Sequence, residues 1–163
     1  MALDFRLLAD VPHLAPTLAA WYDAEWPYLF RPGFTALDEA ESCARNRDRP
    51  DCTVVLLEND EPVAAASLLV DDVLPYPEFS PWLGSVIVRA DRRGAGLGTQ
   101  IVRETMRRAG AMGIRTLHLW TPDHRHFYER LGWSFVQEEM VQAKPVAILR
   151  LSLPRNPANS ATS

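Results

Sequence analysis

A glycine-rich segment in the second half of the chain could bind an anion through its backbone. Residues 94–98 read Gly-Ala-Gly-Leu-Gly and follow the apolar run Val-Ile-Val at 86–88. Three glycines in five residues remove the Cβ atoms that would keep a ligand away from the backbone. A helix is expected to begin there, so its unpaired N–H groups and its dipole would favour a phosphate. Arg92 and Arg93 would add charged hydrogen-bond donors at the same place.

Two common phosphate-binding motifs do not fit this segment. A P-loop requires Gly-x-x-x-x-Gly-Lys-Ser/Thr, and the only lysine of the chain is Lys144. The dinucleotide fingerprint requires Gly-x-Gly-x-x-Gly in a parallel βαβ unit, whereas these glycines are spaced differently and follow an expected antiparallel hairpin. The segment alone therefore predicts a bound phosphate group without naming the compound.

The elements that must position this segment follow from the pattern of apolar residues. We expect strands at 4–8, 51–58, 63–70, 82–88, 116–120, 133–138 and 146–153, and helices at 13–26, 35–46, 96–112 and 125–131. Asn59 and Asp60 are typical turn residues and predict a hairpin between the second and third strands. The pattern predicts an α/β (α+β) fold, with a mixed, mostly antiparallel central sheet of six to seven strands flanked by about four helices.

A second segment, residues 117–133, reads Leu-His-Leu-Trp-Thr-Pro-Asp-His-Arg-His-Phe-Tyr-Glu-Arg-Leu-Gly-Trp. It resembles the second cofactor segment of the GCN5-related N-acetyltransferase (GNAT) superfamily, which ends in Phe-Tyr-x-x-Leu-Gly-Trp/Phe. The pyrophosphate loop of that superfamily, Arg/Gln-x-x-Gly-x-Gly/Ala, is matched by Arg93, Gly96 and Gly98. The resemblance extends over nearly the whole chain, from the first expected strand to the last.

The resemblance implies an acyl-CoA-dependent N-acetyltransferase that uses acetyl-CoA as its co-substrate and holds no metal. The strands at 82–88 and 116–120 would splay apart, and the pantetheine arm would fill the gap by pairing with the backbone of Val86 and Val88. The residues that the resemblance assigns to acetyl-CoA are Val86, Ile87, Val88, Arg93, Gly94, Ala95, Gly96, Leu97, Gly98, Thr99, Thr121 and Phe127.

Tyr128 corresponds to the general acid of the family. When an amine attacks the thioester, CoA leaves as a thiolate, and a nearby phenol can hydrogen-bond to that sulfur or protonate it. The alternative is a structural role for Tyr128 as a core aromatic residue beside Phe127. The surrounding motif favours the catalytic role.

Within the superfamily, several short motifs resemble the actin N-terminal acetyltransferase and its bacterial relatives. They are Leu117-His118-Leu119, Thr121, Asp123, His126-Phe127-Tyr128 and Glu25-Trp26. This similarity favours an N-acetyltransferase of that branch and leaves the acceptor open.

The general base has no clear counterpart in the sequence. Many relatives place a Glu on the strand before the glycine-rich segment, but residues 82–88 read Trp-Leu-Gly-Ser-Val-Ile-Val and contain no acid. The remaining candidates are Glu25, Asp71, Asp72, His118 and His124. Each of them, taken singly, is more often a surface charge or a hydrogen-bonded histidine. A water chain or a backbone carbonyl could also accept the proton.

Charge is unevenly distributed along the chain. Residues 1–80 carry 15 acidic and five basic side chains, whereas residues 81–163 carry six acidic and 12 basic ones. The basic half contains the expected CoA-binding loop, and the acidic half contains the segments expected to shape the acceptor site. An acidic rim would attract a cationic amine, such as a polyamine, an amino sugar or a peptide N-terminus. The alternative is that the two halves simply attract each other.

Length and composition narrow the remaining possibilities. A chain of 163 residues predicts one acetyltransferase domain at 1–154 and a flexible tail at 155–163. No signal-peptide pattern or membrane-length apolar run is present, which predicts a cytoplasmic protein without membrane contact, as a monomer or a homodimer. Cys43 and Cys52 lack metal-ligand spacing and are expected to be buried free thiols.

Two other functions compete with this prediction. A catalytically weak acyl-CoA-binding or regulatory module could share the same fold. Tyr128 and the glycine-rich segment favour the enzyme, whereas the missing strand acid favours the module. Nucleic-acid binding is poorly supported, because the cofactor already accounts for the six arginines between residues 89 and 108 and the net charge is −4.

Overall fold

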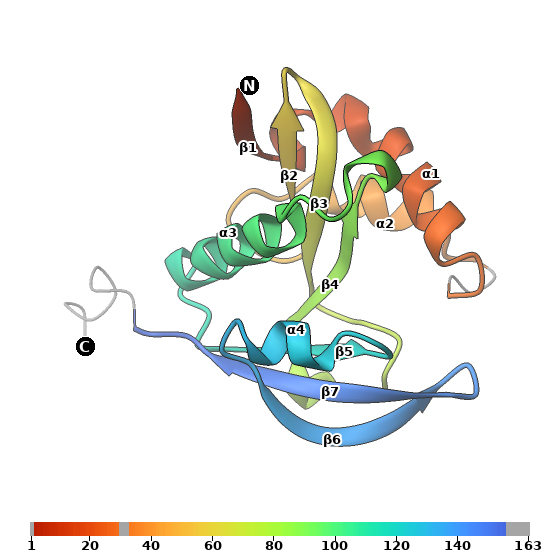
Figure 1. The fold of residues 1–163 in the computed structure, drawn as a ribbon, viewed down its shortest axis with the longest axis vertical. Coiled ribbons are helices and arrows are strands. Elements are labelled where there is room, and N and C mark those ends of the chain that lie inside the picture. Colours follow the sequence, from red (N-terminus) through yellow and green to blue (C-terminus); the bar gives the residue numbers. More distant parts are fainter. Residues whose placement is uncertain (1, 30–32, 156–163) are drawn as a thin grey trace.

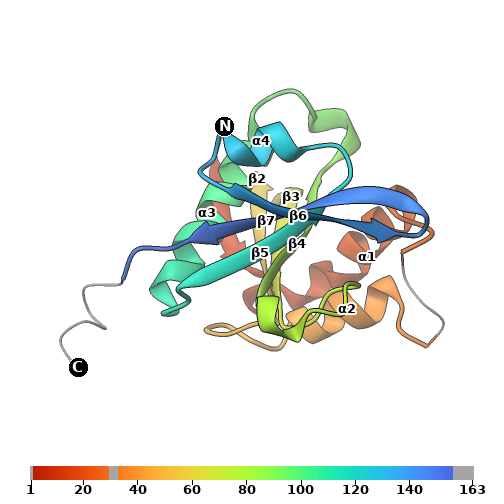
Figure 2. The ribbon, with the colours of Figure 1, turned by 90° about the horizontal axis from the view of Figure 1, so that it is seen from below.

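A seven-stranded sheet forms the centre of the protein, and helices cover both of its faces (Figures 1 and 2). The computed structural model describes residues 2–29 and 33–155. The strands are β1 (Leu3–Leu7), β2 (Cys52–Glu58), β3 (Glu61–Leu69), β4 (Trp82–Val88), β5 (Thr116–Thr121), β6 (Ser134–Val141) and β7 (Lys144–Ser152). The helices are α1 (Ala15–Glu25), α2 (Ala36–Cys43), α3 (Leu97–Ala111) and α4 (Arg125–Glu129). The strand order is β1-β2-β3-β4-β5-β7-β6, and only β4 and β5 pair in parallel, which confirms the expected fold class.

Strand β2 is buried on both faces, which explains its unbroken apolar run. Successive side chains of a strand point to opposite faces of a sheet. Val55 accordingly packs in one cluster with Leu18 of α1, and Val54 packs in another cluster with Ile101 of α3. Full burial of one such side chain contributes roughly 1.5–3 kcal/mol. The two clusters hold α1 and α2 on one face of the sheet and α3 and α4 on the other.

Strands β4 and β5 meet at one point and then diverge (Figure 1). In the described part of the chain, the single paired position is Trp82 with His118, at the start of β4. Farther along, the register of β4 against β3 shifts at a β-bulge, where Ser85 adopts a φ of +50°. A bulge bends a strand and increases its twist. The expected splay is therefore present, and beyond Trp82 no described strand pairs with the edge of β4 that faces β5.

Helix α2 begins with a capping box. The backbone N–H of Asp38 donates to Thr35 Oγ1 at 3.1 Å, and the backbone N–H of Thr35 donates to Asp38 Oδ2 at 2.8 Å. The helix face that follows from this start contains Ala36, Glu39, Ala40 and Cys43, at the spacing of one helical stripe. The two alanines and the cysteine are buried, so Glu39 is carried inward with them.

We expect Thr35→Ala to lower the free energy of unfolding by about 1 kcal/mol, because it removes the side-chain acceptor at the start of α2. Urea denaturation followed by circular dichroism measures this change. Thr35→Ser is the matched control, because serine keeps the hydroxyl and should retain the wild-type stability. Equal losses for the alanine and serine variants would contradict a capping role for Thr35.

The strand boundaries differ from expectation at the last hairpin. Strand β6 extends to Val141 and β7 begins at Lys144, so two residues connect them. These residues, Gln142 and Ala143, both have positive φ values, of 51° and 65°. Two-residue turns of this kind favour Asn, Asp or Gly. Because Gln and Ala are poor signals for such a turn, the sequence predicted a shorter pair of strands.

Smaller differences occur elsewhere. A 3-10 turn, Pro12–Leu14, precedes α1, and α2 ends at Cys43 instead of near residue 46. No helix among the described residues is long and apolar enough to cross a membrane. The expected tail at 155–163 lies outside the described residues, apart from Arg155.

Candidate active site

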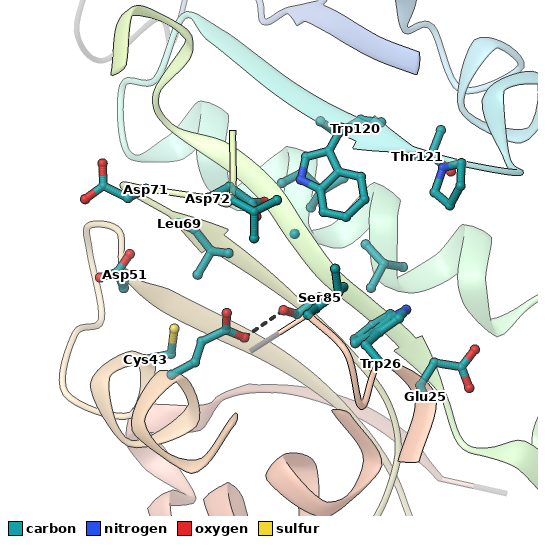
Figure 3. A pocket seen from close by; sticks show the side chains of 18 of the residues that line it. Glu25, Trp26, Cys43, Asp51, Leu69, Asp71, Asp72, Ser85, Trp120 and Thr121 are labelled. Atoms are coloured by element: carbon teal, nitrogen blue, oxygen red, sulfur yellow. Dashed lines mark hydrogen bonds between the residues drawn. The ribbon is translucent and has the colours of Figure 1, made fainter. Parts of the chain in front are cut away.

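A cavity of about 520 Å³ lies where β4 and β5 diverge (Figure 3). On one face of the sheet it is lined by Trp26 at the end of α1 and by Glu39 of α2. It is also lined by Leu119 and Tyr128, which belong to the core cluster on the α3 face. The cavity therefore connects the two faces of the sheet through the gap between the strands.

The glycine-rich loop leaves the start of α3 open to a ligand. Gly94 and Gly96 both have a φ of +81°, a left-handed conformation that strains any residue with a side chain. No described atom lies within 4 Å of the position that a Cβ of either glycine would occupy. No side chain of the described residues caps α3, so the N–H groups of its first turn are available to an anion. Leu97 is buried and anchors the helix, whereas Ala95 is exposed.

The two arginines of the loop make different contacts. Both terminal nitrogens of Arg92 pair with the carboxylate of Glu58 on β2, with Nη2 at 2.7 Å from Oε2. The guanidinium of Arg92 is therefore already bound within the fold, and its expected role as a charged donor to a ligand stays a prediction. Arg93 instead donates from Nη2 to Glu25 at 2.9 Å and from Nε to the carbonyl of Val88 at 3.2 Å. Arg93 thus links the loop, the end of β4 and the end of α1.

The gap beside β4 brings together several residues that were assigned to the cofactor. A Cβ built on Gly98 would lie 3.8 Å from Phe127 and 3.9 Å from Val88. Val86 and Val88 are partly exposed on this strand, and Ile87 between them is buried in the cluster on the α1 face. Thr99 follows in the first turn of α3 and is partly exposed. These segments, distant in sequence, therefore form one continuous surface.

Thr121 lies at the end of β5, where it lines the cavity and organises the turn into α4. Its Oγ1 accepts a hydrogen bond from the backbone N–H of His124 at 3.0 Å. This contact precedes the helix that carries Tyr128.

Tyr128 lies on the cavity wall with 8% of its surface exposed. Its ring packs edge-on against Phe127, with centroids 4.9 Å apart, and against Trp133, with centroids 6.1 Å apart. Burial raises the pKa of the Tyr128 phenol above its usual value. The side chain therefore keeps its proton at neutral pH and can donate it within the cavity.

The opposite part of the cavity is rich in carboxyl groups. The acidic residues that line it are Glu25, Glu39, Asp51, Asp71, Asp72 and Asp123. In Figure 3, Asp72 and Trp120 lie on the far side of Ser85 from Trp26 and Glu25. Burial raises the pKa of Asp72 to about 6, against the opposing effects of the Val73 N–H and the Trp120 side chain.

Glu39 is the site residue that sequence reasoning missed. Its Oε2 accepts a hydrogen bond from Ser85 Oγ at 2.7 Å, across the gap between α2 and the bulge of β4 (Figure 3). Burial raises its pKa to about 7, although the bond from Ser85 acts in the opposite direction. The available signal was its spacing: Glu39 falls three residues after Ala36 and four before Cys43, on the apolar face of the helix.

The five candidates for the general base differ in whether they line the cavity. Glu25, Asp71, Asp72 and His124 line the cavity, whereas His118 does not. The His118 ring stacks on Phe79, with centroids 4.3 Å apart, and its Nδ1 lies 2.9 Å from the Phe79 carbonyl. Burial lowers the pKa of His118, which keeps the ring neutral. His118 is therefore a structural residue outside the cavity, and its candidacy as the base is wrong.

Comparison with known protein families shows the family to which the chain belongs. Residues 16–133 match the model of the Acetyltransferase (GNAT) family, which is more than half of the chain. The chain belongs to the GNAT acetyltransferase family. It is thus an acyl-CoA-dependent N-acetyltransferase by class. No curated protein sequence matches it significantly.

Solved structures share this GNAT fold along nearly the whole chain. An aminoglycoside 6'-acetyltransferase type Ii has 22% identity and a TM-score of 0.71, covering 96% of this chain and 100% of its own. An aminoglycoside 6'-N-acetyltransferase complexed with coenzyme A has 18% identity and a TM-score of 0.71, with coverages of 96% and 99%. An acyl-CoA N-acyltransferase from Pseudomonas aeruginosa has 18% identity and a TM-score of 0.66, with coverages of 93% and 100%. The resemblance to the actin N-terminal acetyltransferase branch stays a prediction.

The residues of this GNAT protein fit acetyl-CoA as co-substrate. Gly94 and Gly96 leave open the space that side chains would fill, and the first turn of α3 offers N–H groups to a pyrophosphate. The unpaired edge of β4 offers backbone groups to an extended pantetheine arm. When bound, acetyl-CoA supplies an acyl thioester. No group of three or more potential ligands for a metal ion occurs among residues 2–29 and 33–155.

Proposed function

We propose that this GNAT protein transfers the acetyl group of acetyl-CoA to a primary amine of a cationic acceptor, by direct attack of the amine on the thioester. The acceptor would be a small cationic amine or a peptide N-terminus. The observation that carries this proposal is the charge of the cavity. Six carboxyl groups line it, and no arginine or lysine of the described residues does.

The six carboxyl groups that line the cavity, called the acidic wall below, would select a cationic amine in two ways. Glu39, Asp51 and Asp72 are only partly exposed, and carboxylates at such positions attract an ammonium group more strongly than the same charges would in bulk water. Trp26, Tyr28 and Trp120 also line the cavity, and aromatic faces attract cations. An amine with further positive charges would therefore be favoured over a neutral one.

The position of the cavity supports direct transfer. Helix α3 and Tyr128 pack on one face of the sheet, whereas Glu39, which lines the cavity, lies on α2 at the other face. Because the cavity connects both faces at the splay of β4 and β5, a thioester and an amine bound on opposite sides could meet there. Holding two reactants together in this way lowers the entropic barrier of a bimolecular step. Two structures with the same fold are aminoglycoside acetyltransferases, which also points to amines with several charges.

The test is a thiol-release assay with acetyl-CoA and a panel of amines at low ionic strength. The panel contains spermidine, an aminoglycoside, a short peptide with a free N-terminus and a neutral arylamine. We expect kcat/KM to be highest for a polycationic amine and to fall as salt is added, because salt screens the attraction of the acidic wall. Faster turnover of the arylamine, without salt dependence, would contradict the proposed acceptor class.

The same assay distinguishes an enzyme from a binding module. Acetyl-CoA binding by calorimetry, without thiol release on any amine of the panel, would favour a catalytically weak acyl-CoA-binding protein. Turnover of any acceptor above the uncatalysed rate would exclude it.

A further inference from the structure

The strand that carries the general base in many relatives has no acid in this chain, yet the described cavity places a carboxyl group beside that strand. We propose that Glu39 of α2 is the general base of this enzyme and that Ser85 of β4 positions it. This inference rests on the proposed function, because it assigns the group that deprotonates the acceptor amine.

The contact between Glu39 and Ser85 places the Glu39 carboxyl group where β4 and β5 diverge. Ser85 sits in the bulge of β4, where the strand turns away from β5, and its Oγ donates to Glu39 Oε2 at 2.7 Å. The other carboxyl oxygen, Oε1, has no hydrogen-bond partner among residues 2–29 and 33–155, and Glu39 lines the cavity. One oxygen is therefore held by the strand, and the other can accept a proton from an amine.

No cation in the described part of the chain neutralises Glu39. Glu25 differs, because it forms an ion pair with Arg93 at 2.9 Å. A buried carboxylate without a paired cation is costly, and it usually becomes protonated or binds a ligand that supplies the charge. An ammonium group of the acceptor would supply it here.

Asp72 is a weaker candidate because its oxygens already have donors. Its Oδ1 accepts from the backbone N–H of Val73 at 2.7 Å, and the Trp120 side chain also lowers its pKa through a hydrogen bond. Asp72 Oδ2 lies only 3.2 Å from the position that a Cβ of Gly84 would occupy. Asp72 therefore suits a role in attracting the amine more than a role in taking its proton.

The groups around Glu39 favour its neutral form at low pH. Burial is the largest cause and raises its pKa, whereas the hydrogen bond from Ser85 lowers it. Asp72, on the loop before β4, and Asp51, before β2, raise it further through charge repulsion. Cys43 on α2 and Tyr22 on α1 also interact with Glu39, and their own pKa values are raised by burial. The net result is a pKa of about 7 for Glu39. A base with this pKa can both accept and release a proton near neutral pH.

The proton balance of the reaction follows from these positions. The acceptor ammonium gives one proton to Glu39, and the freed lone pair attacks the thioester carbonyl carbon. The new C–N bond forms and the C–S bond breaks, so sulfur leaves with the electron pair and takes a proton from Tyr128. The excess proton on the new amide nitrogen returns to the Tyr128 oxygen, directly or through water. Glu39 releases its proton to solvent, which gives one proton per turnover.

The first test compares pH profiles of wild type, Glu39→Gln and Glu41→Gln. For wild type, kcat/KM should fall as the pH drops through about 7, because protonated Glu39 cannot accept a proton. Glu39→Gln should lower kcat/KM about 10²-fold at pH 8 and abolish this dependence, since general-base catalysis typically contributes at least that factor. Glu41 is exposed on the same helix, so Glu41→Gln should keep the wild-type profile.

The second test uses Ser85→Ala. Removing the hydrogen bond that stabilises the carboxylate should raise the pKa of Glu39, so the fall in activity should move to higher pH. A variant that merely disturbed folding would lower activity without moving the profile. A weakly basic amine, already neutral at the assay pH, should largely rescue Glu39→Gln, because it needs no deprotonation before attack.

The third measurement does not depend on turnover. The ¹³C shift of the Glu39 carboxyl, assigned by comparison with Glu39→Gln, should titrate near pH 7. Titration near the ordinary value of about 4.3 would overturn the proposal. So would a wild type that turns over amines while Glu39→Gln keeps the same rate and pH profile. A wild type that acetylates no amine would overturn the proposed function itself, which is a distinct outcome.

Discussion

Replacing Tyr128 with phenylalanine should lower kcat about 10³-fold while leaving the KM for acetyl-CoA almost unchanged. The variant removes one oxygen from a ring that remains packed between Phe127 and Trp133, so binding surfaces are preserved. It also removes the only group of that ring able to protonate a departing thiolate, and general-acid catalysis typically contributes 10²–10⁴-fold. Steady-state thiol release at saturating amine measures both constants.

Tyr76→Phe is the matched control for this variant. Tyr76 also carries a phenol, which donates to Glu139, but it does not line the cavity. It should keep kcat within about threefold of wild type, as expected for a change that removes no transition-state contact. Unchanged kcat for Tyr128→Phe, or an equal loss in both variants, would rule out the general-acid role. The raised pKa of Tyr128 also predicts that no loss of activity from its ionisation appears at or below pH 9.

Gly96→Ala should lower kcat/KM for acetyl-CoA about 10³-fold. Gly96 has a φ of +81° at the start of α3, and the space beside it is empty where an alanine Cβ would project. The methyl group would both strain the left-handed turn and block the approach of a phosphate to the first N–H groups of the helix. Loss of two charge-assisted hydrogen bonds at about 2 kcal/mol each corresponds to that factor. Calorimetry with CoA would show the same loss in binding.

Gly113→Ala separates this effect from backbone strain. Gly113 follows the opposite end of α3 with a φ of +87°, so alanine there carries a similar cost of about 1–2 kcal/mol in stability. It should lower the melting temperature without raising the Kd for CoA. If both variants weakened CoA binding to the same extent, the loop would not be the phosphate site.

The parts of the site that sequence predicted best are those in which one local feature decides the structure. Strand β4 has the boundaries expected, 82–88, because proline precedes it and the glycine-rich loop follows it. Asn59 and Asp60 form the expected turn with positive φ values, since their short polar side chains tolerate that conformation. The loop at 94–98 was recognisable because three glycines in five residues indicate a turn whose backbone a ligand can approach closely.

The parts that sequence missed depend on contacts between distant segments. Glu39 lies 46 positions before Ser85, and only the packing of α2 against the bulge of β4 brings them together. His118 lies in the middle of β5, and the sequence does not decide which way its ring faces. The structure shows that the ring stacks on Phe79, far away in sequence. Arg92 and Arg93 are adjacent and of the same type, yet one binds Glu58 inside the fold and the other binds Glu25 beside the cavity. Nothing local distinguishes them.

The division of the cavity between two halves of the chain has a consequence for how such enzymes diverge. The described carboxyl groups of its acidic wall come mainly from residues 25–72, while the glycine-rich loop, α3 and α4 come from residues 94–129. The halves touch near the site through the bulge of β4 and the ion pair between Arg93 and Glu25. Under the proposed function, substitutions in the first half would alter the accepted amine and leave the donor half intact. One scaffold would then acquire new acceptors without rebuilding its acyl-donor site.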